Sequence, residues 1–176
     1  IMKYVRTFAP KKSPCDSRYT LFNNCIYDFK NKTTIPISDE YVFFNKIPHD
    51  YIEDCEVVEI IDQYFQTLSN NEEDIARLLK EMIAYCLIRS NILDKFFITC
   101  GEGGCGKSDY FELTTALLGR NNVSFRDLED LQDSKGVAAL KDKLLNIGDD
   151  IDPTYIERCS NLKKLSTGQR VKGKIL

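Results

Sequence analysis

The sequence predicts an α/β fold, and three observations lead to this prediction. A short apolar run, Phe96 to Ile98, stands directly before a glycine-rich segment, as a buried parallel strand would. From Tyr110 to Leu118 apolar residues recur at helical spacing, and Gly119 follows where a glycine commonly ends a helix. A second apolar run, Leu144 to Ile147, comes later in the chain. Strands that alternate with helices are typical of a parallel sheet covered by helices.

Residues 101–108, called here the glycine-rich loop, match the phosphate-binding pattern G-x-x-x-x-G-K-[ST]. Glycines allow left-handed backbone and a close approach to a ligand, so that successive N–H groups and a helix N-terminus form an anion site. Lys107 is expected to reach the β- and γ-phosphates of ATP, and the Ser108 hydroxyl to hold Mg²⁺. The alternative is a glycine-rich turn that binds nothing, but the predicted strand and helix around the loop favour a nucleotide site. The predicted nucleotide-binding residues are Gly101, Glu102, Gly103, Gly104, Cys105, Gly106, Lys107, Ser108 and Asp109.

Two acids follow the second apolar run directly, at Asp149 and Asp150. A parallel strand delivers such residues to the edge of the sheet where α/β proteins bind ligands. We therefore expect Asp149 to hold Mg²⁺ and Asp150 to polarise the attacking water, with Lys107 as the third catalytic residue.

We expect the chain to divide into three regions, the last of which contains the glycine-rich loop and the two acids. Residues 1–50 are expected to be irregular and β-rich, with a hairpin of Tyr19–Phe22 and Cys25–Phe29 around Asn23-Asn24 and a further strand over Tyr41–Phe44. Residues 51–92 form a helical lead-in of two amphipathic helices. Residues 93–176 form the ATPase core, in which Val123–Phe125 is a strand and Val137–Leu140 is helical. The lone histidine, His49 beside Pro48, is interpreted as a loop residue at the start of a helix.

The first helix of the lead-in is expected to present one apolar face, and the second a regular apolar stripe for packing. The first face is Val57, Ile61, Tyr64, Phe65 and Leu68, and the stripe is Ile75, Leu78, Leu79, Met82, Ile83, Cys86 and Leu87.

The composition indicates a soluble globular protein, with 43% hydrophobic and 29% charged residues among 176. No apolar run reaches the roughly 18 residues of a membrane helix, so no membrane partner is expected. Seven cysteines without a C-x-x-C pair favour reduced thiols in the cytoplasm over a disulfide framework or a zinc site. The N-terminus does not resemble a natural start, so we expect a fragment of a longer protein.

Cys105 is unusual because it lies inside the glycine-rich loop, beside a helix N-terminus that can stabilise a thiolate. Two interpretations stay open: any small residue fits this position, or thiol alkylation here blocks ATP binding.

The charge is uneven along the chain. Although the net charge is −3, the segment 153–176 carries six basic residues and one acid, a local balance of +5. A basic segment on an acidic body predicts a local contact with a polyanion; a solvated charged surface is the alternative.

Together these residues resemble the helicase part of phage- and plasmid-type primase-helicases, within superfamily 3 of the AAA+ ATPases. The resemblance runs from about Arg18 to the end. The segments that carry it are Leu21 to Asp50 with Ile47-Pro48-His49-Asp50-Tyr51, Ile75 to Ser90, Gly101 to Ser108, Leu144 to Asp152, and Leu162 to Gln169.

The resemblance implies an incomplete AAA+ sheet, MgATP bound between the subunits of a homo-oligomeric, hexameric ring, and DNA unwinding in phage or plasmid replication. It also implies that Lys163, Lys164, Lys172 and Lys174 contact single-stranded DNA in the central channel. The sequence departs from the family at Cys105, where Asn is usual, and at Gln169, where Asp is usual. The chain also ends before the family's polar sensor residue and arginine finger, so this piece alone is expected to hydrolyse ATP poorly.

Two other functions are compatible with the sequence. One is a nucleotide-binding module that assembles into rings without unwinding DNA. The other is a P-loop kinase for a small molecule, for which no acceptor pocket or arginine-bearing lid is evident.

Overall fold

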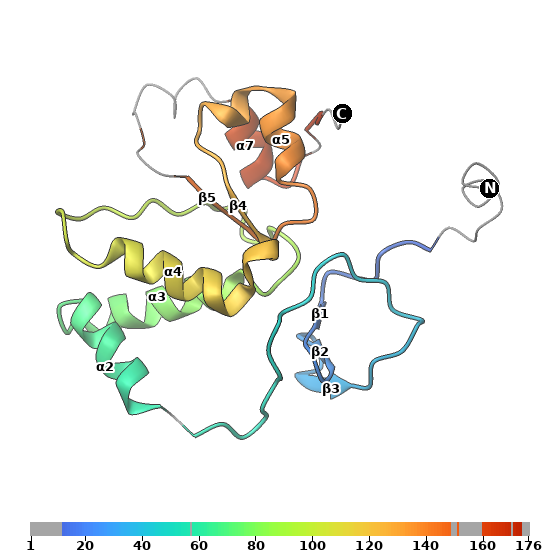
Figure 1. The fold of residues 1–176 in the computed structure, drawn as a ribbon, viewed down its shortest axis with the longest axis horizontal. Helices are drawn as coiled ribbons and strands as arrows, with labels where there is room; N and C mark the ends of the chain where they lie inside the picture. Colours follow the sequence, from blue (N-terminus) through green and yellow to red (C-terminus); the bar gives the residue numbers. More distant parts are fainter. Residues whose placement is uncertain (1–11, 57, 149–150, 152–159, 170, 174–176) are drawn as a thin grey trace.

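The computed structural model describes residues 12–56, 58–148, 151, 160–169 and 171–173. The described chain is a mixed α/β structure with a small antiparallel sheet and a short parallel one (Figure 1). The principal elements in chain order are β1 (Tyr19–Leu21), β2 (Ile26–Asp28), β3 (Thr33–Ile35), α2 (Glu59–Leu68), α3 (Glu73–Tyr85), α4 (Lys107–Leu118), β4 (Val123–Phe125), α5 (Ser134–Ala139), β5 (Leu145–Ile147) and α7 (Ser160–Ser166).

The predicted N-terminal hairpin is confirmed: β1 pairs antiparallel with β2, with Leu21 opposite Ile26. A third strand that the sequence reasoning missed, β3, pairs with β2 on the other side. The strand predicted over Tyr41–Phe44 is wrong, because this stretch is bends and irregular backbone. Within the described chain, its ladder-like contact is a hydrogen bond from the Cys15 N–H to the Val42 carbonyl, which is too little to define a strand.

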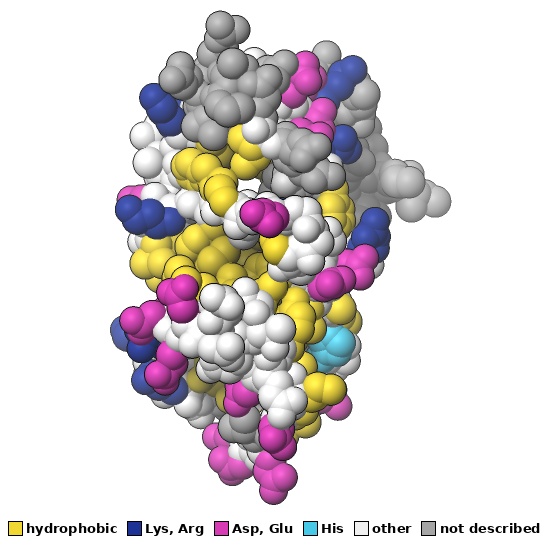
Figure 2. Space-filling view, turned by 90° about the vertical axis from the view of Figure 1, so that its left-hand side faces the viewer, with side chains coloured by type: hydrophobic (Ala, Val, Ile, Leu, Met, Phe, Trp, Pro, Cys, Tyr) yellow, Lys and Arg dark blue, Asp and Glu magenta, His cyan; other side chains and the backbone are white. Residues whose placement is uncertain are grey.

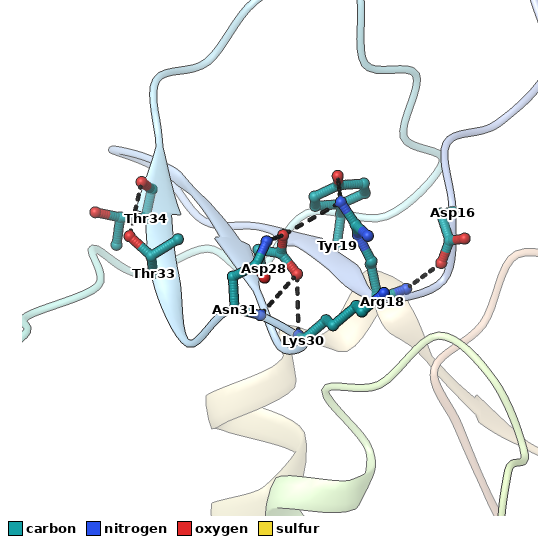
Figure 3. A network of polar contacts seen from close by, with 8 residues as sticks. All are labelled: Asp16, Arg18, Tyr19, Asp28, Lys30, Asn31, Thr33 and Thr34. Carbon is teal, nitrogen blue, oxygen red and sulfur yellow. Dashed lines mark hydrogen bonds and ion pairs between the residues drawn. The ribbon is translucent and has the colours of Figure 1, made fainter.

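The β2–β3 turn is held by one buried carboxylate, that of Asp28 (Figure 3). Asp28 Oδ1 accepts from the Lys30 N–H at 2.9 Å, and its Oδ2 accepts from the Asn31 amide at 2.9 Å. Arg18 supplies the opposite charge at 3.4 Å. A buried carboxylate is stable only when paired and hydrogen-bonded in this way, so the network is structural.

The two helices predicted for the lead-in are present as α2 and α3. They pack through Phe65, Ala76 and Ile83, which are buried together with Tyr110 of α4. Not every residue of the predicted stripes points inward: Ile61, Ile75 and Leu78 are exposed, and Val57 lies outside the described residues. The Asn70-Asn71 connection takes left-handed backbone at both residues, which asparagine tolerates better than most residue types.

The strands predicted at Val123–Phe125 and within Leu144–Ile147 are confirmed as β4 and β5, and the structure pairs them in parallel, with Val123 opposite Leu145 and Phe125 opposite Ile147. In Figure 1, α3 and α4 lie on one side of this pair and α5 and α7 on the other. The core joins the two sheets, because Phe22 and Ile47 from the N-terminal part are buried with Leu118 and Val123. Among the described residues, no helix is long and apolar enough to cross a bilayer.

The predicted strand over Phe96–Ile98 is wrong. Residues 95–100 are irregular, and the three apolar side chains are 43–47% exposed. Figure 2 shows hydrophobic side chains gathered in a broad band across the middle of one face of the molecule. The predicted strand is absent because a buried parallel strand needs partners on its edges, and the described parallel sheet consists of β4 and β5 alone.

His49 is a loop residue, as predicted, but it does not stand at the start of a helix, because α2 begins at Glu59. Its Nε2 lies 2.9 Å from the Ala116 carbonyl oxygen. The neighbouring Pro48 packs so close to Gly119 that a Cβ there would lie 2.8 Å from the proline ring. The His49 segment therefore anchors the end of α4.

Candidate functional site: the glycine-rich loop and the start of α4

The four glycines of the loop serve different purposes. Gly104 and Gly106 take left-handed backbone, with φ of 77° and 86°, which is the conformation that glycine adopts without steric cost. Gly101 provides space instead, because a Cβ there would lie 2.5 Å from Cys105 Sγ. A Cβ at Gly103 would meet nothing within 4 Å. The sequence reasoning therefore expected left-handed backbone at more positions than the loop uses.

Lys107 folds back over the loop. Its ammonium Nζ donates to the Gly101 carbonyl at 2.7 Å and to the Glu102 carbonyl at 3.0 Å, and lies 3.3 Å from Cys105 Sγ. Among the described residues, the positive charge is thus held against the loop by backbone carbonyls and the Cys105 sulfur. An anion that entered the loop would add charge–charge attraction to its hydrogen bond with this ammonium.

The loop leads directly into α4, whose N-cap is the left-handed Gly106. The first N–H groups of a helix lack intrahelical acceptors and carry the positive end of the helix dipole. Ser108 and Asp109 lie in this first turn with exposed side chains. The structure therefore brings together Lys107, Ser108 and the free N–H groups, a donor set suited to phosphate.

The acidic partners of the predicted site, Asp149 and Asp150, lie outside the described residues. The strand before them is in place, since β5 ends at Ile147 and Gly148 follows. Within the described ranges, no three His, Cys, Asp or Glu side chains gather as a metal cluster. The Ser108 hydroxyl is among the described residues, and it is a hard oxygen ligand of the kind that Mg²⁺ prefers.

Three of the four predicted DNA-binding lysines can be placed. Lys163 and Lys164 are exposed on α7, and Lys172 is exposed in the segment that follows. The C-terminal end of α7 is tied down by Asn91, whose side-chain amide donates to the Leu165 and Ser166 carbonyls. Near Lys172, a Cβ on Gly173 would lie 3.1 Å from Ala138 Cα, which sets this segment against α5. Lys174 lies outside the described residues.

A separate hollow lies beside the middle of α4 and contains none of the predicted site residues. Its volume is about 440 Å³. The residues that line it are Phe111, Glu112, Thr115, Ala116, Arg120 and Phe125. Arg120 lies over the Phe125 ring, 4.8 Å from its centre.

One contact of the loop was missed by the sequence reasoning, which assigned Leu68 to a packing face of α2. In the structure, a Cβ on Gly106 would lie 2.9 Å from Leu68 Cδ1. The apolar periodicity placed Leu68 on the inward face, but no sequence signal pairs it with a loop more than thirty residues later.

A model of a protein family, described as a family of unknown function (DUF5906), matches residues 99–174. This stretch is less than half of the chain, and it takes in the glycine-rich loop, α4, both parallel strands and α7. No curated protein matches the sequence. The family description names no activity, so a functional proposal depends on the site itself.

Proposed function

We propose that this chain is the nucleotide-binding part of an ATP-dependent DNA helicase of the superfamily 3, AAA+ type, acting in phage or plasmid replication. The observation that carries the proposal is the loop itself. Gly104 and Gly106 are left-handed, and the Lys107 ammonium lies over the loop at the N-terminus of a twelve-residue helix. These features support binding of a nucleoside triphosphate.

In the proposed site, Lys107 exchanges the Gly101 and Glu102 carbonyls for β- and γ-phosphate oxygens. The N–H groups of the loop and of the first turn of α4 donate to the same phosphates. Ser108 would hold Mg²⁺, which when bound neutralises charge that develops on the phosphates. Asp149 and Asp150 are proposed to hold the metal and to orient the attacking water. Most of the catalytic effect then comes from positioning and charge.

The helicase part of the proposal adds single-stranded DNA and a homo-oligomeric, hexameric ring in the cytoplasm. The exposed Lys163, Lys164 and Lys172 support the DNA contact, with Lys174 as a fourth member of the set. Because such contacts release counterions, DNA affinity should fall steeply with rising salt concentration.

The first prediction concerns Lys107. In the intact gene product that contains this chain, Lys107→Ala should abolish saturable binding of labelled ATP in the presence of Mg²⁺, because the loop loses its cation. Lys141→Ala is the matched control, since Lys141 is an exposed lysine whose ion pair among the described residues is with Asp142, and it should bind like wild type. ATP binding or turnover that survives in Lys107→Ala would refute the nucleotide site.

The ATPase rate of the same intact gene product distinguishes a helicase from a ring-assembly module that does not unwind DNA. A helicase should hydrolyse ATP faster when single-stranded DNA is added, whereas a module that binds nucleotide without unwinding should not respond. An ATPase rate that is independent of DNA would favour the module.

A further inference from the structure

Among the described residues, no strand leads into the glycine-rich loop or supports it. Residues 95–100, which lead into it, are irregular, and their apolar side chains Phe96 to Ile98 are exposed. The loop residues 101–105 are exposed as well. A loop that must hold its N–H groups toward one point needs a rigid neighbour, and in the described structure that neighbour is a helix from another part of the chain.

The neighbour is the last turn of α2. Leu68 Cδ1 would lie 2.9 Å from a Cβ on Gly106, so the leucine side chain lies directly against the loop backbone. Gly106 is also the left-handed N-cap of α4. Leu68 therefore touches the residue at which the loop turns into the helix.

The position of Leu68 is fixed by the core. Phe65, three residues earlier, is 4% exposed and packs edge-on against Tyr110 of α4, with ring centres 6.5 Å apart. The Tyr110 hydroxyl donates to the Leu79 carbonyl of α3 at 2.9 Å. The three helices are thus joined at one end of α4, and a close-packed wall of this kind has little freedom to move.

Tyr64, one turn before Leu68, also faces the start of α4. Its hydroxyl is buried and makes no hydrogen bond within the described chain. Burial raises the pKa of this phenol, and the carboxylate of Asp109 raises it further. Asp109 stands in the first turn of α4, so two successive turns of α2 adjoin the beginning of the phosphate-binding helix.

We infer that Leu68 is a positioning residue of the nucleotide site, and that α2 holds the glycine-rich loop in the conformation that accepts phosphate. The inference rests on the proposed nucleotide binding and assigns the 59–68 helix a part in it. Leu68 acts through Gly106 and touches no phosphate. Shortening this side chain should leave the chain folded and loosen the loop.

The test is a titration of the intact gene product with MgATP and, separately, with inorganic triphosphate and Mg²⁺, which probes the loop without a base. Leu68→Ala should weaken the binding of both ligands by a similar factor, about tenfold, because a loop that is misplaced relative to the phosphates loses affinity for them. Leu68→Met, which conserves volume, should restore affinity to within about twofold of wild type. Ile60→Ala is the control on the same helix, because Ile60 is 70% exposed, and it should bind like wild type.

Circular dichroism verifies that each variant is folded at the titration temperature. If Leu68→Ala does not fold, Leu68→Val is judged by the same criterion. Equal affinities for Leu68→Ala and Ile60→Ala would overturn the inference while the nucleotide site stands, and so would a Leu68→Met variant as weak as Leu68→Ala. Wild-type protein that binds neither ligand would overturn the proposed function and this inference with it.

Discussion

At the scale of single residues, the site depends on how close side chains approach the loop backbone. Gly101 leaves room for the Cys105 sulfur, and Gly106 combines left-handed backbone with the Leu68 contact. A side chain at Gly106 would have to adopt left-handed backbone and would clash with Leu68, whereas one at Gly103 would meet nothing within 4 Å. The glycines of this loop therefore meet several separate steric requirements.

Two cysteines in contrasting surroundings allow a prediction about thiol chemistry. Burial raises the pKa of Cys86 to about 11, so this thiol stays protonated at neutral pH, and the thiolate is the reactive form. Cys105 is exposed, with its sulfur 3.3 Å from Lys107 Nζ. Iodoacetamide at pH 7.5 should label Cys105 well before Cys86, as measured by peptide mass spectrometry. Labelling should weaken ATP binding about tenfold or more, or ~1.4 kcal/mol.

Cys105→Ser, treated with iodoacetamide in the same way, provides the control for modification of other thiols, among them Cys55 and Cys100, which are exposed in the described chain. It should keep its affinity for ATP. Unchanged nucleotide affinity after quantitative labelling of Cys105 would instead favour the simpler interpretation that any small residue fits this position.

At the scale of elements, α5 shows how a short helix is fixed at its beginning. Asp133 is its N-cap, and its Oδ1 accepts from the Lys135 and Gly136 N–H groups. A Cβ on Gly136 would lie 1.9 Å from the Asp130 carbonyl oxygen, so the turn before the helix approaches too closely for any other residue. A capped start and a tight approach together define where α5 begins.

The cap makes stability depend on pH. The backbone N–H groups of Gly136 and then Lys135 hold the pKa of Asp133 below its ordinary value of 3.8. A lowered pKa in the folded state adds stability above the unfolded value, and this stability is lost as the pH falls through the folded value. Urea unfolding should therefore show that the advantage of wild type over Asp133→Asn is full near pH 6 and shrinks below about pH 4.

Asparagine still accepts the two hydrogen bonds but carries no charge, so the comparison isolates the ionised carboxylate. Asp54→Asn, at an exposed acid, is the control for general charge effects. A difference between wild type and Asp133→Asn that stays constant from pH 6 to pH 3 would contradict the assignment.

At the scale of the whole molecule, one side chain links the helical region to the N-terminal sheet. Arg89 donates from Nε to the Tyr19 carbonyl at 2.7 Å, and from Nη2 to the Cys15 and Asp16 carbonyls at 3.0 and 2.6 Å. Its guanidinium also lies 5.0 Å from the centre of the Phe43 ring. Arg89 therefore supplies a charged hydrogen-bond donor to three backbone carbonyls of the N-terminal segment.

Arg89→Ala should lower the free energy of unfolding by about 1.5–3 kcal/mol, because hydrogen bonds from a charged group to three backbone carbonyls are lost. Arg89→Lys should recover part of the loss, since a lysine cannot reproduce the planar fork of donors. Urea unfolding monitored by circular dichroism measures both. Arg77→Ala, which removes only exposed ion pairs of α3, should cost less than about 1 kcal/mol, and an equal loss in the two alanine variants would contradict the role of Arg89.

Much of this architecture could be predicted because it is local. The β1–β2 hairpin follows from two apolar runs around Asn23-Asn24, and α3 and α4 follow from their periodicity and flanking residues. The phosphate-loop pattern correctly predicted where α4 begins. The strand expected at Phe96–Ile98 failed because a parallel strand exists only through its neighbours, and apolar content alone does not supply them.

The sequence by itself determined the β1–β2 hairpin, the helices α2, α3 and α4 and the places of the strands β4 and β5, because propensity, periodicity and glycine placement act over a few residues. Only the tertiary structure decided that Leu68 lies against Gly106, that Arg89 holds the N-terminal sheet, and that residues 96–98 stay exposed. These contacts join segments that are distant in the chain, and packing in three dimensions, rather than local preference, selects them.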